Sequence, residues 1–315
     1  MREKILEYIR EGDFNKVFVQ MPEGLLRKAP KLSDFLSEEN IESVISLEPC
    51  YGACDVREED AKKLDCDLII HLGHSDFGVE TDIPVLYYPW KVDVDLVSPV
   101  KNGLEKISKY KKIGLITSIN YINSLRNVRK FLEENGKSVF TYKGGKAEHE
   151  GQILGCDLAS ALRIEDKVDC FLYVGSGEFH SLGVALESSK PVFRVDIEER
   201  DIKKIDSEVF ERQRMVAIGK AMDCKKFGIL VSVKPGQLKN DLASRIKERL
   251  EQFDKKGYIL SFDRITPEKL MGVEVDCYIN TACPRIAIES RTEFKKPILN
   301  PEEFRKVVGK WRKGN

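Results

Sequence analysis

Cysteine side chains are the residues of this sequence whose types and spacing best fit a chemical role. Cys50 and Cys54 lie in a loop-like segment, residues 48–56, that is broken by a proline and a glycine. The alternating apolar residues 44–47 before it predict a buried strand, and a helix-like segment follows it. Because α/β proteins bind ligands beyond the carboxyl ends of their strands, two thiols in such a loop suggest a metal or redox site.

The composition of the 315-residue chain restricts the roles of its eight cysteines. Lys+Arg and Asp+Glu are equal at 52 each, which argues against a dedicated nucleic-acid-binding surface. No apolar run approaches the roughly 18 residues needed to span a bilayer, and the N-terminus does not resemble a signal peptide. We therefore expect a cytoplasmic protein that contacts neither membranes nor nucleic acid directly. Disulfides are rare in that compartment, so we expect thiols that are free, catalytic or metal-bound.

Three markers recur along the chain with a period of about 105 residues and indicate an internal repeat. The first is a Val or Leu followed by Asp-Cys and an apolar strand, and its aspartates are Asp65, Asp169 and Asp276. The second is a proline that precedes an apolar strand, at Pro84, Pro191 and Pro297. The third is a strand that begins with lysine near the start of each repeat.

The segments between these markers predict an α/β fold of three pseudo-symmetric, Rossmann-like modules with parallel sheets. A helical pattern follows the first strand of the later modules and ends at Asn135-Gly136 in the second and at Lys256-Gly257 in the third. Strand–helix–strand units of this length imply parallel strands joined by right-handed crossovers. We place the modules at residues 1–100, 101–205 and 206–315. The alternative is a single irregular α/β domain.

The repeat sorts the cysteines into two groups. Four lie in or beside apolar runs, where cysteine behaves as a small hydrophobic residue, and three of these share the Asp-Cys marker. We expect this group to be structural: Cys66, Cys170, Cys224 and Cys277. The second group lies in loops: Cys50, Cys54, Cys156 and Cys283.

Each module offers one loop thiol at the carboxyl side of its expected sheet, namely Cys54, Cys156 and Cys283. If the modules surround a pseudo-threefold axis, the three thiols can converge on a central iron-sulfur site. Three protein thiolates leave a 4Fe-4S cluster with one iron open to a substrate, whereas structural zinc normally takes four ligands. From the spacing alone, a zinc site or a purely structural role stays open.

Seven motifs that occur in order along the chain resemble those of one known family. They are PEGL at 22–25, YGACD at 51–55, HLGHS at 71–75, GQILGC at 151–156, YVGSGEFH at 173–180, KPGQ at 234–237 and NTACPR at 280–285. Over nearly its whole length the chain closely resembles the archaeal 2-(3-amino-3-carboxypropyl)histidine synthases, which perform the first step of diphthamide biosynthesis.

The resemblance implies a homodimer of three-module subunits, each of which holds a 4Fe-4S cluster through Cys54, Cys156 and Cys283. It implies a transferase of the radical S-adenosylmethionine type that lacks the usual CxxxCxxC motif. The reduced cluster would cleave S-adenosylmethionine into methylthioadenosine and a 3-amino-3-carboxypropyl radical. That radical would add to C2 of a histidine imidazole in translation elongation factor 2, and a small electron-donor protein would supply the electron. The resemblance does not make Cys50 a ligand.

Six further residues are candidates for binding S-adenosylmethionine: Glu23, Ser176, His180, Gly236, Gln237 and Arg285. Backbone N–H groups in the Gly236-Gln237 loop suit a carboxylate, and a guanidinium beside Cys283 suits bidentate pairing with one. For each candidate a structural role stays open, such as a plain turn, a salt bridge or a buried histidine. We expect no catalytic residue beyond the cluster.

His71 and His74 suggest a metal site with Cys54, but in this family we expect them to pack or to form hydrogen bonds. Two other functions stay open for the whole chain. One is a dehydratase similar to quinolinate synthase, which also combines three α/β modules with a three-cysteine cluster. The other is a non-catalytic, metal-stabilised partner subunit.

Overall fold

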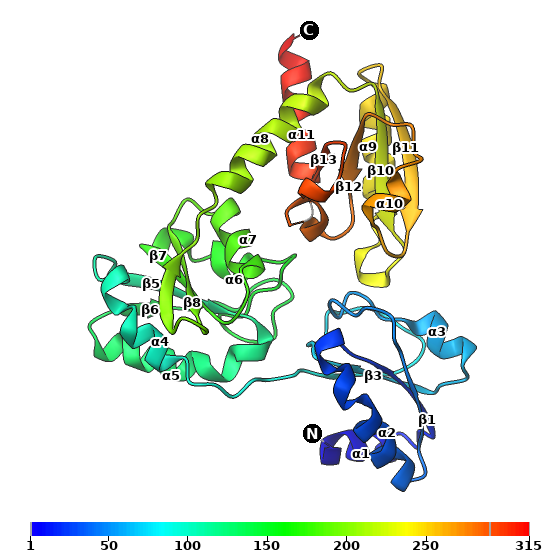
Figure 1. Cartoon of the computed structure of the whole chain (residues 1–315), viewed down its shortest axis with the longest axis vertical. Helices are drawn as coiled ribbons and strands as arrows, with labels where there is room; N and C mark the ends of the chain where they lie inside the picture. The colour runs from blue at the N-terminus through cyan, green and yellow to red at the C-terminus, as the bar shows by residue number, and fades with distance from the viewer. Residues whose placement is uncertain (1, 290, 315) are drawn as a thin grey trace.

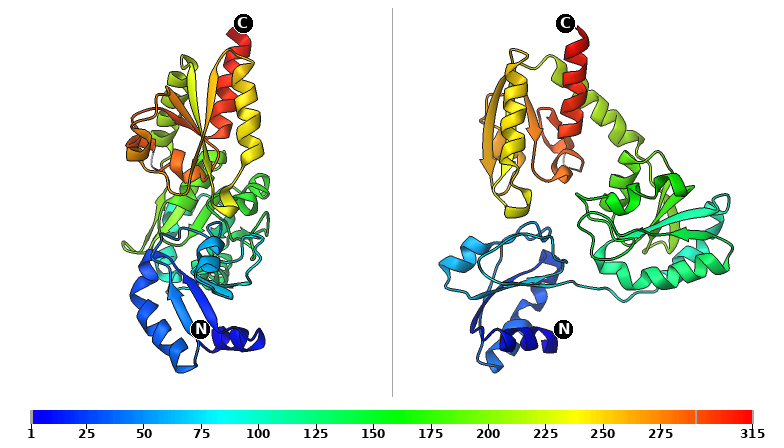
Figure 2. Two further views of the ribbon diagram at one scale, coloured as in Figure 1. Left: turned by 90° about the vertical axis from the view of Figure 1, so that its right-hand side faces the viewer. Right: turned by 180° about the vertical axis from the view of Figure 1, so that it is seen from behind.

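The computed structural model describes residues 2–289 and 291–314, and these contain three separate β-sheets that follow one another along the chain. Figure 1 shows the three α/β modules at the corners of a triangle, and the view from behind in Figure 2 shows the same arrangement. The strand orders are β2-β1-β3-β4, β6-β5-β7-β8-β9 and β11-β10-β12-β13. Among the paired strands for which a register is described, only β8 and β9 run antiparallel. The prediction of an α/β fold with three mainly parallel sheets is confirmed.

The first module is built around its two central strands, β1 (Lys16–Gln20) and β3 (Leu68–Leu72). Both are buried nearly throughout, as expected for parallel strands that are covered on both faces. The edge strands are β2 (Glu42–Ile45) and β4 (Val85–Tyr88). The helices are α1 (Arg2–Glu11), the 3-10 helix η1 (Glu23–Lys28), α2 (Ala29–Glu38) and α3 (Glu58–Lys63).

The second module repeats this order and adds a strand. Its sheet contains β5 (Lys112–Thr117), β6 (Ser138–Phe140), β7 (Cys170–Val174), β8 (Val192–Asp196) and β9 (Asp201–Lys204). Its α-helices are α4 (Val97–Asn102), α5 (Ile122–Glu134), α6 (Ala159–Leu162) and α7 (Phe179–Glu187). Its 3-10 helices are η2 (Leu104–Ile107), η3 (Ile119–Tyr121) and η4 (Glu165–Lys167). The α5 helix ends at the predicted Asn135-Gly136, where Gly136 has a positive φ of 76°.

The third module contains the strands β10 (Lys226–Ser232), β11 (Lys256–Phe262), β12 (Cys277–Asn280) and β13 (Ile298–Leu299). Its α-helices are α8 (Glu208–Met222), α9 (Asn240–Glu251), α10 (Pro267–Leu270) and α11 (Pro301–Gly314). Its 3-10 helices are η5 (Pro235–Gln237), η6 (Pro284–Ala287) and η7 (Arg291–Glu293). The predicted end of α9 at Lys256-Gly257 is wrong. The helix ends at Glu251, and Lys256-Gly257 begin β11, where Gly257 lets the strand pack closely on Leu250.

The same hydrogen bonds recur in all three modules and show that they are structural repeats. An aspartate before the third strand accepts backbone N–H groups at the start of the first strand. Its own N–H donates to the carbonyl of the lysine that begins the first strand. These clamp residues are Asp67, Asp169 and Asp276. The carbonyls of Pro84, Pro191 and Pro297 likewise accept equivalent N–H groups from the third strands.

The predicted repeat register is therefore wrong in the first module, where the sequence marker selected Asp65 instead of Asp67. Asp65 has a positive φ of 53° just beyond α3 and does not occupy the clamp position. Leu68 pairs with β1 as Cys170 and Cys277 pair with β5 and β10. Cys66 is thus not the structural equivalent of Cys170 and Cys277.

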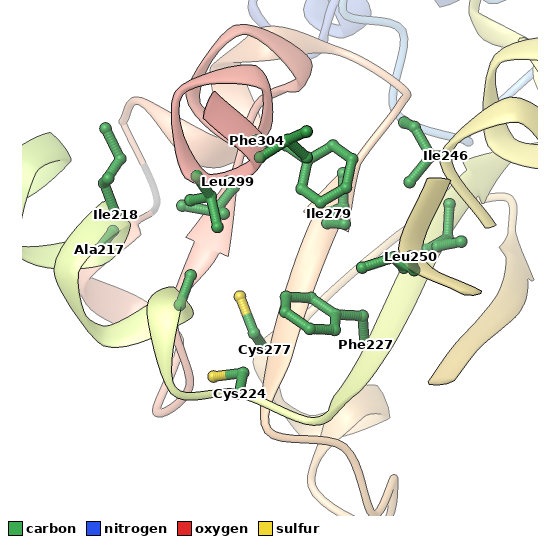
Figure 3. Packing of buried hydrophobic residues seen from close by; sticks show 14 of the residues in the cluster. Ala217, Ile218, Cys224, Phe227, Ile246, Leu250, Cys277, Ile279, Leu299 and Phe304 are labelled. Atoms are coloured by element: carbon green, nitrogen blue, oxygen red, sulfur yellow. The ribbon is translucent and has the colours of Figure 1, made fainter. Parts of the chain in front are cut away.

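The four cysteines expected to be structural are buried in hydrophobic cores. Cys170 lies in the core of the second module and Cys66 in a small cluster of the first. Figure 3 shows Cys224 and Cys277 in the core of the third module, near Phe227. None of the helices in the described ranges combines the length and the apolar character needed to cross a membrane.

The packing of α4 and α8 indicates to which module each helix belongs. The expected boundary between residues 100 and 101 falls inside α4, which packs against α5 and β9 of the second module. The expected boundary between residues 205 and 206 falls between β9 and α8, and α8 packs against α11 and β13. We propose three modules as the division of the chain, with the first boundary moved to the segment before α4.

Candidate metal centre

Cys54, Cys156 and Cys283 lie in loops beyond the carboxyl ends of strands in three different modules. They follow β2, β6 and β12, respectively. Burial raises the pKa of the Cys283 thiol to about 11, and the nearby Cys54 and Cys156 thiols act in the same direction. The structure therefore brings one loop thiol from each module together. That these thiols bind a metal stays a prediction.

The loop at Gly236-Gln237 in the third module touches Cys54 of the first. The N–H of Gly236 donates to the Cys54 carbonyl at 2.9 Å, and the amide of Gln237 donates to Cys54 Sγ at 3.3 Å. A Cβ atom on residue 236 would lie 2.6 Å from the Cys54 Cα, so only glycine permits this approach. Two predicted cofactor-binding residues thus form an interface with a predicted metal ligand.

A buried ion pair crosses the same interface one residue from Cys54. The Lys234 ammonium donates to the Asp55 carboxylate, and their side chains are only 10% and 3% exposed. Burial raises the pKa of the Asp55 carboxyl above its usual value, although Lys234 acts in the opposite direction. Arg57 of the first module also contacts Asp263 of the third, at 3.3 Å. Sequence reasoning missed this network, because Lys234 and Asp55 were recognised only as members of separate motifs.

Buried amide side chains hold two of the cysteine loops in place. The amide N–H of Gln20 donates to the Asp55 carbonyl, and its oxygen accepts the N–H of Arg57, both at 2.9 Å. Asn280 donates to the carbonyl of Cys283 at 2.8 Å. The loops of Cys54 and Cys283 are therefore attached to strands β1 and β12, respectively, and not only to neighbouring loop residues.

Phe179 joins the loops of the other two cysteines and was also missed by sequence reasoning. Its ring packs so closely on Gly155, next to Cys156, that no Cβ would fit there. The guanidinium of Arg285, two residues beyond Cys283, lies 4.4 Å from the centre of the same ring. Arg285 also pairs with Glu289 at 2.6 Å, so its charge is already compensated.

The remaining predicted cofactor-binding residues lie in different environments. His180 stacks on Tyr173 with 5.8 Å between ring centres, and burial lowers its pKa to about 4, with the charge of Arg285 acting in the same direction. Ser176 is exposed and shares a hydrogen bond of 2.7 Å with the Tyr121 hydroxyl. Glu23 is exposed at the start of η1, and no hydrogen bond or ion pair of its side chain is found among the described residues.

A cavity of about 400 Å³ lies between the second and third modules. Gly155 and Cys156 form part of one wall, and Pro284, next to Cys283, forms part of another. Lys239, near the start of α9, adds positive charge, whereas Arg291 is paired with Glu303, which also lines the cavity. The volume is within the range of small-molecule sites, and the cavity reaches one predicted metal ligand directly.

The donor set around the three thiols fits a 4Fe-4S cluster. Three thiolates leave one iron without a protein ligand, and N–H donors to sulfur, such as the amide of Gln237, stabilise such clusters. The close backbone approach at Gly236 is of the kind that lets loops surround a compact group. The sulfur of Cys50 instead lies 3.6 Å from His71 Nε2.

Comparison with known proteins identifies related sequences along nearly the whole chain. The sequence profile of the diphthamide synthesis protein family matches residues 21–315. The 2-(3-amino-3-carboxypropyl)histidine synthase of Pyrococcus horikoshii is 35% identical over 310 residues, which cover 98% of this chain and 90% of that protein. The protein of the same name from Methanocaldococcus jannaschii is 33% identical over 325 residues, which cover 96% of this chain and 88% of that protein.

A solved structure shows the same fold. The crystal structure of Dph2 from Pyrococcus horikoshii with a 4Fe-4S cluster has a TM-score of 0.92 and 35% sequence identity to this chain. The match covers 98% of this chain and 90% of that chain.

The buried ion pair predicts a pH-dependent cost of substitution. Lys234→Met leaves the Asp55 carboxylate buried without its partner, which should lower the free energy of unfolding by about 3–5 kcal/mol near pH 8. The loss should shrink at lower pH, because protonation removes the uncompensated charge. Denaturant unfolding at several pH values measures it. The double variant Lys234→Met, Asp55→Asn is the control and should recover most of the loss, whereas a fully stable single variant at pH 8 would contradict the ion-pair account.

His180 predicts a loss of stability in mild acid. Its folded pKa of about 4 lies below the ordinary value of 6.5, so between these pH values the unfolded chain binds a proton that the folded chain excludes. This residue should therefore lower the free energy of unfolding by up to about 1.4 kcal/mol per pH unit as the pH falls through that window. His180→Phe, which keeps an aromatic ring on Tyr173, should show a shallower dependence in denaturant unfolding. An unchanged slope would exclude burial of the neutral imidazole.

Proposed function

The chain belongs to the diphthamide synthesis protein family, and on that premise we propose that it transfers the 3-amino-3-carboxypropyl group of S-adenosylmethionine to C2 of a histidine imidazole in translation elongation factor 2. Family membership confirms the resemblance inferred from the seven motifs. It favours a synthase over a dehydratase similar to quinolinate synthase. The observation that carries the proposal is the convergence of one loop thiol from each of three modules.

The proposed ligands of a 4Fe-4S cluster are Cys54, Cys156 and Cys283. When bound and reduced, the cluster would supply the electron that splits the bond between the sulfonium and the methionine γ-carbon, giving methylthioadenosine and the 3-amino-3-carboxypropyl radical. That radical would add to C2 of the imidazole, and loss of one proton and one electron from the adduct would restore aromaticity. The protein determines which carbon of S-adenosylmethionine faces the open iron. That selection depends on the loops around the three cysteines.

Burial raises the pKa of the Cys54 and Cys283 thiols, so both must lose a proton when they bind iron. The amide N–H that Gln237 directs at Cys54 Sγ favours the thiolate and acts against the effect of burial. Lys234 lowers the pKa of Cys54 through its nearby charge as well. Gln237 and Lys234 of the third module therefore favour the thiolate form of Cys54 in the first module.

The cavity between the second and third modules is the proposed entrance for S-adenosylmethionine, because Cys156 lies in its wall. We retain Glu23, Ser176, His180, Gly236, Gln237 and Arg285 as candidate contacts. A carboxylate bound by Arg285 would have to replace Glu289, which pairs with that guanidinium. The Phe179 ring, 4.4 Å from that guanidinium, would hold it in place during the exchange.

The proposed biological setting follows from the same function. The active form would be a homodimer that acts on elongation factor 2 in the cytoplasm and receives its electron from a small donor protein. No membrane and no direct nucleic-acid contact is part of this proposal.

The cleavage product tests the reaction. After anaerobic reconstitution with iron and sulfide and reduction with dithionite, the protein should convert S-adenosylmethionine into methylthioadenosine. Chromatography of the products measures this. The appearance of 5′-deoxyadenosine instead would show that a different carbon–sulfur bond breaks. If no S-adenosylmethionine is consumed and the protein contains about one zinc and no sulfide per chain, the result would favour a non-catalytic subunit.

Cysteine substitutions test the ligand set. Replacement of Cys54, Cys156 or Cys283 by alanine should abolish the visible absorption of thiolate-to-iron charge transfer, because each removes one of only three protein ligands. Cys170→Ala and Cys277→Ala are matched controls, since both thiols are fully buried in module cores. Reconstituted controls should keep the wild-type absorption and iron content. Full absorption in any of the three ligand variants would exclude that cysteine.

A further inference from the structure

A second group of metal-binding side chains lies within the first module, outside the three converging cysteines. Cys50 follows β2, His71 lies on β3, and His74 follows β3. Their sulfur and ring nitrogen atoms all lie within 4.8 Å of one another. Cys50 and His71 are buried, and His74 is partly buried.

Two of the distances among these three side chains fit a metal-coordination polyhedron, and the ligand atoms of the third pair, Cys50 and His74, lie within 4.8 Å of each other. Cys50 Sγ lies 3.6 Å from His71 Nε2, and that nitrogen lies 3.1 Å from His74 Nδ1. A tetrahedral zinc ion binds sulfur at about 2.3 Å and nitrogen at about 2.0–2.1 Å, which places a sulfur and a nitrogen ligand about 3.6 Å apart and two nitrogens about 3.3 Å apart. The ion would therefore require shifts of only a few tenths of an ångström in these two contacts.

Hydrogen bonds alone satisfy this group poorly. His71 Nε2 carries either one hydrogen or one lone pair, yet both Cys50 Sγ and His74 Nδ1 point at it. As a donor it can serve only one neighbour, and as an acceptor it must divide one lone pair between two. His71 Nδ1 and the nearby Tyr87 hydroxyl are also buried without a hydrogen-bond partner among the described residues. A cation would accept the lone pairs of all three converging atoms at once.

The protonation states are compatible with metal binding. Burial lowers the pKa of His71 to about 3 and that of His74 to about 4, so both imidazoles are neutral near pH 7, which is the form that binds metals. Burial raises the pKa of the Cys50 thiol to about 12. A bound cation would displace the thiol proton, so its affinity should rise with pH.

We propose that Cys50, His71 and His74 form a site for a zinc-like divalent transition metal, separate from the three cysteines of the candidate cluster. The mixed thiolate and imidazole donors suit zinc, with a water molecule or another group as the fourth ligand. The ion would join the loop after β2, which carries Cys54, to the loop after β3. The inference does not depend on the proposed transferase function.

Cobalt binding tests this site in protein that cannot hold the cluster. The full chain with Cys54→Ala, Cys156→Ala and Cys283→Ala should bind one Co²⁺ per chain under anaerobic conditions and show thiolate-to-cobalt charge-transfer absorption. Adding Cys50→Ser should abolish that absorption, and adding His74→Ala should abolish stoichiometric binding. Cys66→Ser is the matched control, because this thiol of the same module lies in a separate hydrophobic cluster and contacts the Leu64 carbonyl. No stoichiometric Co²⁺, or charge transfer that survives Cys50→Ser, would overturn the proposal.

Metal analysis of the reconstituted wild-type protein is a second test of the site, and it does not require the triple variant to fold. One zinc per chain should accompany the iron, and Cys50→Ser should remove the zinc while the iron content and cluster absorption persist. Loss of iron with zinc retained would assign Cys50 to the cluster instead of the zinc site and would overturn the inference. Failure of the transferase reaction would not affect either readout.

Discussion

The site depends on bringing three loops from separately folded modules to one point and holding them there. Each module has its own sheet and its own core, so its internal packing does not determine where its cysteine lies relative to the other two. That position is determined by a few contacts between modules. They include the Asp55–Lys234 ion pair, the approach of Gly236 to Cys54, and Phe179 between Gly155 and Arg285.

These contacts occur where they do because the three sheets share one construction. Parallel strands place all their carboxyl ends at one edge, and in each module an aspartate clamps the first strand to the third. The loops beyond those edges carry the cysteines. Buried amides such as Gln20 and Asn280 then attach the loops to their own strands, so the rigidity of the sheet extends to the thiols. Since a buried charge without its partner is costly, Asp55 and Lys234 also oppose separation of the first and third modules.

The features that could be predicted from the sequence are those with a periodic or local signal. The three α/β repeats follow from recurring strand patterns, and the equivalence of Pro84, Pro191 and Pro297 holds in the hydrogen bonds. The register of the first repeat was wrong, because an Asp-Cys pair matched by residue type, whereas hydrogen bonding selects Asp67. The pairing of Lys234 with Asp55 and the position of Phe179 had no local signal, since both depend on how whole modules pack. The ligand roles of the three cysteines followed from the family resemblance together with their loop positions, and they stay predictions.

The most direct test of three-module convergence is an anaerobic crystal structure of the reconstituted protein with S-adenosylmethionine. We expect a 4Fe-4S cluster whose three protein-bound irons are ligated by Cys54, Cys156 and Cys283, with S-adenosylmethionine on the fourth iron. A cluster bound by Cys50, or one held by cysteines from only two modules, would contradict it.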